Sequence, residues 1–186
     1  MLLIVLGVIV FFSIHALPWH PNFRAGVVVK LGPSRYRASF SVVALVGLVL
    51  LIIGKVQAPF ISLYTPPIWG RTLALPLVFV ALILLPAANM PPSNIKRLIR
   101  HPMLVGILLW SCAHLLANGD VASVILFGSF AIYSAVDILS ANSRGKNKHL
   151  LVAPISKDIM VIAAGSVAYV IILFAHPYLF GAPVIL

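Results

Sequence analysis

Long apolar runs separated by short polar segments dominate this chain and predict a bundle of membrane-spanning helices. A helix that crosses a bilayer needs about 20 mainly apolar residues. The segments that reach or approach this length are 2–17, 39–56, 72–88, 103–117, 121–140 and 159–175. We therefore expect an all-α, polytopic integral membrane bundle with about six transmembrane helices, forming one transmembrane domain over residues 1–186.

Two local signals refine this arrangement. The first apolar run lacks a basic segment in front of it and a good cleavage site behind it, so we expect a retained helix and not a signal peptide. The fourth and fifth segments are joined by Asn118-Gly119-Asp120. We expect a tight turn that uses a positive φ at Gly119 and folds the two segments into an antiparallel hairpin.

Composition agrees with a membrane protein. Of the 186 residues, 62% are hydrophobic and 9% are charged, whereas a soluble domain carries about 25% charged residues. The formal net charge is +10, with three Asp and no Glu. In a soluble protein this excess would suggest nucleic acid, but in a membrane protein it indicates topology, so we expect no nucleic-acid partner.

The basic residues predict the orientation. Eleven of the thirteen Lys and Arg fall on one side of a six-span arrangement: Arg24, Lys30, Arg35, Arg37, Lys96, Arg97, Arg100, Arg144, Lys146, Lys148 and Lys157. Only Lys55 and Arg71 fall on the other side. By the positive-inside rule, the basic connections are cytoplasmic and both termini are outside. Aromatic residues near the span ends fit interfacial anchors: Trp19, Tyr36, Tyr64, Trp69 and Tyr178.

Two histidines fall inside predicted spans, His15 in the first and His114 in the fourth. An ionisable side chain inside a bilayer is costly, which makes each a functional candidate. His114 shares a helix face with apolar, aromatic and small residues: Met103, Ile107, Trp110 and Ser111. Such a wall with a single coordinating nitrogen is typical of a site for a flat hydrophobic cofactor such as haem.

The helix rise allows one site that uses both histidines. Counted from Arg24 and Arg100, His15 lies about 13 Å deep and His114 about 21 Å deep, and tilt absorbs a difference of about 8 Å. A bis-His site between the first and fourth spans is therefore allowed. The alternative is that each imidazole only donates a structural hydrogen bond to a carbonyl.

The remaining candidate metal ligands fit less well. His101 is about 20 Å from His114 along a straight helix and about 220° round its axis, which excludes a shared small-metal site. Cys112 lies on a different face from His114, and no carboxylate is near it in the sequence, which disfavours zinc or copper. His176, before Pro177, is expected at the interface.

Two sequence blocks resemble a known family. The first is Phe12-Ser-Ile-His15-Ala-Leu-Pro18, followed by Phe23-Arg24 and by Leu31-Gly-Pro-Ser-Arg-Tyr-Arg37. The second is RHPMLVGILLWSCAHLLANGD, residues 100–120. The chain resembles the NnrU family over nearly its whole length. These bacterial membrane proteins are associated with nitrite and nitric oxide reduction genes, and the family includes the zeta-carotene isomerase, a haem b enzyme.

The resemblance implies a bacterial inner-membrane protein that binds haem b, with His15 and His114 as axial ligands and His101 near the haem. It implies either a role beside denitrification components or redox-gated cis–trans isomerisation of a lipophilic, carotenoid-like polyene. We expect Trp110 to line the cofactor. Arg24, Arg35 and Arg37 are expected to pair with the haem propionates, or else to serve only topology and headgroup contact.

Two other function classes stay open. Residues 100–106, RHPMLVG, also resemble the RHPxYxG signature of small membrane methyltransferases that bind S-adenosylmethionine. Here Leu104 replaces the Tyr, and the Glu-rich C-terminal block of those enzymes is absent. The other class is a non-catalytic assembly factor or a small transporter. A proton-coupled transporter usually needs intramembrane carboxylates, and only Asp137, near a span end, is available.

Small residues within the predicted spans indicate where helices can approach closely. Gly106, Gly128 and Gly165 are each inside a predicted span. Because a glycine has no Cβ, it lets two helix backbones come together in a membrane. We expect these positions to support close helix packing, either within one chain or between chains.

Overall fold

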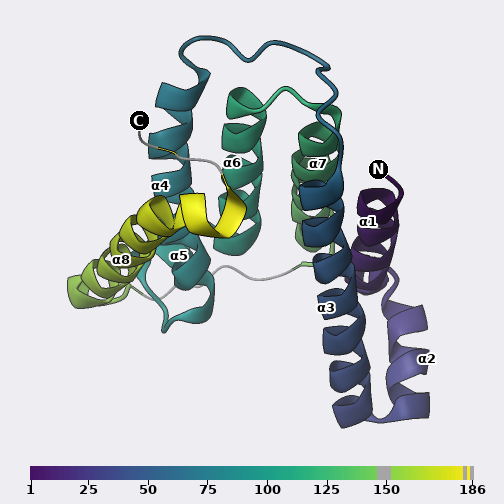
Figure 1. Cartoon of the computed structure of the whole chain (residues 1–186). Helices are drawn as coiled ribbons and strands as arrows, with labels where there is room; N and C mark the ends of the chain where they lie inside the picture. Colours follow the sequence, from purple (N-terminus) through teal and green to yellow (C-terminus); the bar gives the residue numbers. More distant parts are fainter. Residues whose placement is uncertain (146–151, 182–183, 185–186) are drawn as a thin grey trace. The chain divides into compact units, whose positions relative to one another are not determined.

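The computed structural model describes residues 1–145, 152–181 and 184, and it is helical throughout the predicted spans (Figure 1). Three predicted cytoplasmic residues, Lys146, Lys148 and His149, lie outside the described residues. The helices are α1 (Leu2–His15), η1 (Leu17–Trp19), α2 (Pro21–Leu31), α3 (Pro33–Gln57), α4 (Gly70–Asn89), α5 (Asn94–Leu98), α6 (Pro102–Ala117), α7 (Val121–Ser143) and α8 (Ile155–Phe180).

Helix length and composition confirm a multi-pass membrane protein. Five helical segments in the described part of the chain are long and apolar enough to cross a membrane: α3, α4, α7, α8 and the segment Leu2–Trp19. The predicted fourth span is the apolar helix α6, which has 16 residues. At 1.5 Å per residue it is about 24 Å long, less than the roughly 30 Å thickness of a hydrocarbon core.

Several boundaries differ from the hydropathy pattern. The connection between the first two spans contains a further helix, α2, which ends at Gly32 with a φ of 79°. Helix α3 begins at Pro33, before the predicted residue 39, because proline is well suited to the first turn of a helix. Helix α8 continues through Pro177 and ends before Gly181, whose left-handed φ of 69° caps it.

The turn between α6 and α7 is not built as predicted. The described glycines with positive φ are Gly32, Gly145 and Gly181, so the expectation for Gly119 was wrong. The turn is held by side-chain and backbone hydrogen bonds instead. Asp120 accepts a hydrogen bond of 3.0 Å from the backbone N–H of Ser123, and Val121 donates its N–H to the carbonyl of Ile61 at 2.9 Å.

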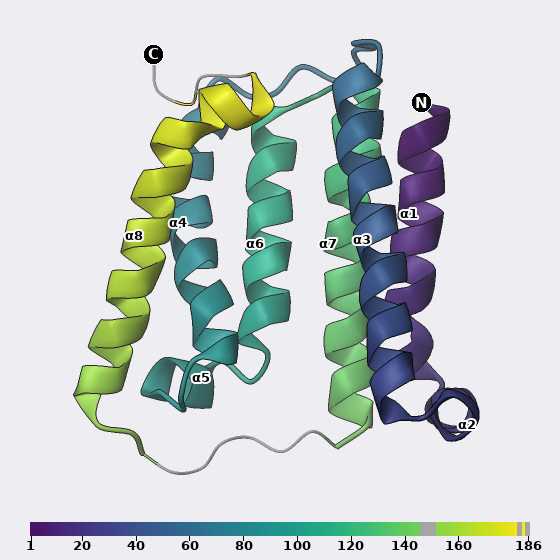
Figure 2. The same cartoon turned by 60° about the horizontal axis from the view of Figure 1, so that its bottom comes forward.

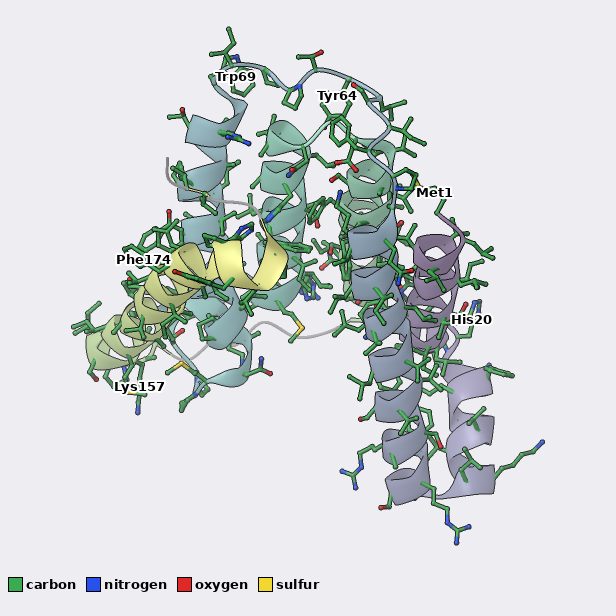
Figure 3. The ribbon with its side chains drawn as sticks, in the orientation of Figure 1. Met1, His20, Tyr64, Trp69, Lys157 and Phe174 are labelled. Atoms are coloured by element: carbon green, nitrogen blue, oxygen red, sulfur yellow. The ribbon has the colours of Figure 1, made fainter. Side chains whose placement is uncertain are left out.

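The chain forms two compact units. Unit 1 consists of residues 1–64 and 120–129, and unit 2 consists of residues 65–119 and 130–186. The first part of α7 therefore belongs to unit 1 and the rest to unit 2. In Figure 3, Tyr64 and Trp69 lie on the segment that connects α3 and α4. A single functional domain over the whole chain stays a prediction.

In unit 1, α1 packs side by side with α3 in antiparallel orientation (Figure 2). Glycines make this approach possible. A Cβ added at Gly7 would lie 2.6 Å from the backbone nitrogen of Leu51, and a Cβ at Gly47 would lie 2.7 Å from the nitrogen of Phe11. Gly54 faces the backbone of Ile4 in the same way. These three close contacts were not predicted from the sequence.

In unit 2, α6 and α8 both pack against α4. A Cβ at Gly106 would lie 3.1 Å from the carbonyl oxygen of Ala81, and a Cβ at Gly165 would lie 2.5 Å from the Cα of Ile83. These two predicted small-residue contacts are confirmed. Gly128 makes no close contact within the chain, because nothing lies within 4 Å of a Cβ placed there, and a contact between chains at this position stays a prediction.

Polar contacts connect the helix ends within unit 2. The His101 ring lies 3.0 Å from the side-chain oxygen of Asn142, near the end of α7, so α6 and α7 are antiparallel as predicted. The buried Asp158 in the first turn of α8 accepts hydrogen bonds from the side chain of Asn94 at 2.7 Å and the backbone of Ile95 at 2.9 Å. These bonds attach α5 to the start of α8.

Candidate functional site

His15 is the last residue of α1, and its ring is held by the helix itself and by α3. Its Nδ1 lies 2.7 Å from the carbonyl oxygen of Phe11, one helical turn earlier. The Phe11 ring stacks on the imidazole at a centroid distance of 4.1 Å. The Phe40 ring, from α3, meets it edge-on at 5.1 Å. Two aromatic rings and one hydrogen bond therefore fix this imidazole within unit 1.

His114 lies near the end of α6, in unit 2, and repeats this local arrangement. Its Nδ1 is 2.8 Å from the carbonyl oxygen of Trp110, again four residues earlier. The indole of Trp110 lies 4.9 Å from the imidazole, and the ring of Phe130 meets the indole edge-on at 5.5 Å. The predicted neighbour Ser111 is buried, and its hydroxyl donates to the carbonyl of Ile107.

These hydrogen bonds determine the tautomer of both imidazoles. A carbonyl oxygen only accepts hydrogen bonds, so the Nδ1 of His15 and of His114 carries the proton. In each neutral ring, Nε2 is then the nitrogen with the lone pair. A metal-bound histidine usually donates its other ring N–H to a backbone carbonyl or a carboxylate in the same way.

The sequence contains a signal for this arrangement, but only its part around His114 was predicted. Trp110 was predicted beside His114, whereas Phe11 was not singled out. Both histidines have an aromatic residue four positions earlier in a helix, and residues at this spacing share a face. The contact with Phe40 has no such signal, because this residue is far from His15 in the sequence and only the packing of α1 against α3 brings it there.

The predicted propionate-binding arginines differ in their surroundings. The Arg24 Nε donates to the hydroxyl of the buried Tyr36 at 3.3 Å, and its guanidinium lies 5.5 Å from the centre of that ring. Tyr36 in turn lies 6.4 Å from Phe40, which contacts His15. Arg37 is exposed on α3. Tyr36, predicted as an interfacial anchor, is instead a packed residue next to the His15 surroundings.

Two other histidines lie in unit 2. His101 precedes the first residue of α6 and bonds Asn142, so it lies near the opposite end of this helix from His114, as predicted. His176 was expected only as an interfacial residue. In the structure it lies within α8, and its ring is 4.8 Å from that of Phe180. It is therefore a third imidazole on an apolar helix.

A separate polar cluster lies in unit 1 where α3 ends and α7 begins. The Lys55 Nζ, in the last turn of α3, lies 2.8 Å from a carboxylate oxygen of Asp120 and 2.7 Å from the hydroxyl of Ser123. Burial raises the pKa of Asp120, but the hydrogen bonds from Lys55 and Ser123 outweigh burial and hold the pKa below its ordinary value. The carboxylate is therefore ionised at neutral pH and joins α3 to the start of α7.

Among the residues that the structure describes, no three His, Cys, Asp or Glu side chains gather as a metal-binding group. Cys112 is exposed. The candidate metal ligands in the described residues are therefore separate imidazoles on apolar helices.

The helices and their composition define a multi-pass, all-α membrane protein. Within this class, the model of the NnrU protein family matches residues 3–184. The chain therefore belongs to the NnrU family, as its two sequence blocks predicted. No curated protein and no solved structure matches it.

Proposed function

We propose that this NnrU family protein binds haem b and that His15 and His114 would hold the iron. The observation that carries the proposal is the repeated arrangement around the two imidazoles. Each lies on an apolar helix, donates its Nδ1–H to the carbonyl four residues earlier, and packs against the aromatic ring of that residue.

The chemistry of these groups fits a haem. Iron is bound by an unprotonated imidazole nitrogen, and Nε2 is that nitrogen in both rings once Nδ1 carries the proton. Haem takes only one or two ligands from the protein, so isolated histidines suffice where a bare metal ion would need a cluster. Trp110 and the apolar residues of α6 offer the flat hydrophobic wall that a macrocycle prefers.

The arginines supply the complementary charge. Haem propionates are carboxylates, and guanidinium groups bind carboxylates through strong, charge-assisted hydrogen bonds. Arg37 is exposed, and Arg24 is oriented by Tyr36. In this proposal the two arginines bind the propionates, and His101 lies near the haem without ligating it.

When bound, the haem would supply one-electron redox chemistry. The family resemblance gives this chemistry two uses: a role in nitrite and nitric oxide metabolism beside denitrification components, or redox-gated cis–trans isomerisation of a lipophilic polyene. In both, the protein's contribution is the same. His15 and His114 would hold the iron, their carbonyl partners fix the ring orientation, and the apolar helices exclude water.

The test is the absorption spectrum of the detergent-purified protein, oxidised and dithionite-reduced, together with a pyridine haemochrome assay. We expect about one b-type haem per chain. His15→Ala and His114→Ala should each lower the haem content or shift the absorption bands. His20→Ala, an exposed histidine at the start of α2, is the matched control and should change neither.

Two results would contradict the proposal. One is absence of haem after expression with an adequate haem supply. The other is an unchanged spectrum in both ligand variants. His176→Ala, in α8, belongs in the same series, because loss of haem in this variant and not in His15→Ala would assign the second ligand to α8.

We also propose that the protein lies in the bacterial inner membrane with both termini outside. The asymmetry of the basic residues supports this orientation. An alkaline phosphatase fusion at the C-terminus should be active and a green fluorescent protein fusion should be dark. The opposite pattern would require a different number of spans or the reverse orientation.

A further inference from the structure

Helix α2 runs across the ends of two membrane spans. In Figure 2 it is seen end-on, whereas α1 and α3 of the same unit are seen along their length. Helix α3 and the segment Leu2–Trp19, which contains α1, are long and apolar enough to cross a bilayer. A helix that crosses such spans near their ends lies along a membrane face, at the level of the lipid headgroups. His20, at the start of α2, lies at this junction in Figure 3.

Three cations at this end of unit 1 have no counter-charge. Lys30, Arg35 and Arg37 are exposed, and none has a hydrogen-bond or ion-pair partner among the described residues. The sequence contains no acidic residue before Asp120. Asp120 itself is bonded to Lys55, in the last turn of α3, whereas Arg35 and Arg37 lie in the first turns of that helix.

Two cations in unit 2 have partners within the protein. Arg144 pairs with Asp137 at 3.1 Å, and the Lys96 ammonium donates a hydrogen bond to the carbonyl of Ala88 at 2.7 Å. Lys30 and Arg35 have no such partner among the described residues, so an anion from outside the chain can pair with them.

Exposed apolar side chains accompany these cations. Phe23, Val27 and Leu31 recur every four residues and so share one face of α2. Phe23 is 62% exposed and Leu31 is 41% exposed. A phospholipid satisfies both kinds of group at once, because its phosphate pairs with the cations while its acyl chain covers the apolar stripe. A soluble anion covers no apolar surface.

We propose that α2 and the first turns of α3 form a binding surface for anionic phospholipids. The lipid class is one with net negative headgroup charge, such as phosphatidylglycerol. The headgroup phosphate lies between Lys30 and Arg35, and the acyl chain lies along Phe23 and Leu31. This surface does not depend on the proposed haem.

The test is native mass spectrometry of the full-length protein in non-ionic detergent, with equal amounts of phosphatidylglycerol and phosphatidylcholine. Wild type should retain phosphatidylglycerol preferentially. Lys30→Gln/Arg35→Gln should lower this preference at least fivefold, since each cation near a lipid surface contributes about fivefold at low ionic strength. Arg71→Gln/Lys157→Gln removes the same charge from unit 2 and should keep the preference.

Two further arms keep the proposal falsifiable even if a variant fails to fold. Raising the ionic strength from about 0.05 M to about 0.5 M should weaken the wild-type preference, because the interaction is exposed to screening. Inorganic phosphate at the lipid concentration should not displace the lipid. Equal loss of preference in both double variants, no preference in wild type, or displacement by phosphate would each overturn the proposal.

Discussion

The contact between α1 and α3 provides a quantitative test of unit 1. The perturbation is Gly47→Ala, which adds one methyl group where α3 approaches Phe11. That Cβ would lie 2.7 Å from the Phe11 nitrogen, 2.8 Å from its Cα and 2.9 Å from its Cβ, whereas ordinary contacts begin at 3.4 Å. The helices must therefore separate by about 0.7 Å, and the nearest obstacle is backbone, which cannot rotate away.

The size of the effect follows from two terms. Overpacking of this kind costs about 1–3 kcal/mol. Replacing glycine by alanine within a helix stabilises the helix by about 1 kcal/mol. Gly128→Ala, in α7, is the matched control, because a Cβ there has nothing within 4 Å and only the helix term applies. The free energies of unfolding of the two variants should therefore differ by about 1–3 kcal/mol.

The assay is thermal unfolding in one detergent, followed by circular dichroism. Gly47→Ala should melt below wild type or close to it, and Gly128→Ala at or above wild type. For a chain of this size the two midpoints should differ by at least about 2 °C. If Gly47→Ala melts as high as Gly128→Ala, the close packing of α1 on α3 is wrong. With haem bound, Gly47→Ala should also broaden the absorption bands, since Phe11 holds the His15 ring.

Three further predictions concern other contacts. The pKa of Asp120 is lowered in the folded protein, so its ionised form stabilises the fold at pH values above the ordinary aspartate pKa of about 4. This stabilisation is lost as the pH falls through the lowered pKa of the folded state. The midpoint of unfolding should drop more steeply below pH 4 in wild type than in Asp120→Asn, and equal slopes would refute the cluster. Gly165→Val should destabilise unit 2 by about 1–3 kcal/mol or more in chemical denaturation, and an unchanged midpoint would contradict the α4–α8 contact. If the protein binds haem through His15 as proposed, Phe40→Leu should shift the haem midpoint potential in a redox titration with haem content retained; an unshifted potential would show that Phe40 does not position a His15 ligand.

The sequence predicted the membrane class and most of the helices for a simple reason. In a hydrocarbon core every backbone polar group must bond within its own segment, so a sufficiently long apolar run has to be helical. The same regularity explains why the local surroundings of the candidate ligands are largely readable. A histidine in a helix meets the residue four positions earlier, which places Phe11 at His15 and Trp110 at His114 whatever the rest of the chain does.

Hydropathy was less informative where a helix lies outside the apolar runs or ends gradually. Helix α2 contains Arg24, Gly26 and Lys30 within 11 residues. Because these residues interrupt the apolar pattern, the hydropathy predicted a connection between two spans here and not a helix. Helix α6 was found, but its 16 residues are fewer than the pattern of a full span suggests. The end of α8 was misjudged because Pro177 removes a donor near the end of the helix without terminating it.

The amino-acid sequence by itself determined the apolar runs, the charge asymmetry and the i to i+4 partners of each histidine. Only the tertiary structure decided which distant residues meet: Phe40 at His15, Asp120 at Lys55, Gly47 at Phe11. These pairs depend on how helices cross and on their register, and in a membrane those are set by side-chain packing, because hydrocarbon lipid and apolar side chains are equally good neighbours. Hydropathy shows that a residue is apolar, but it does not show which helix packs against that residue.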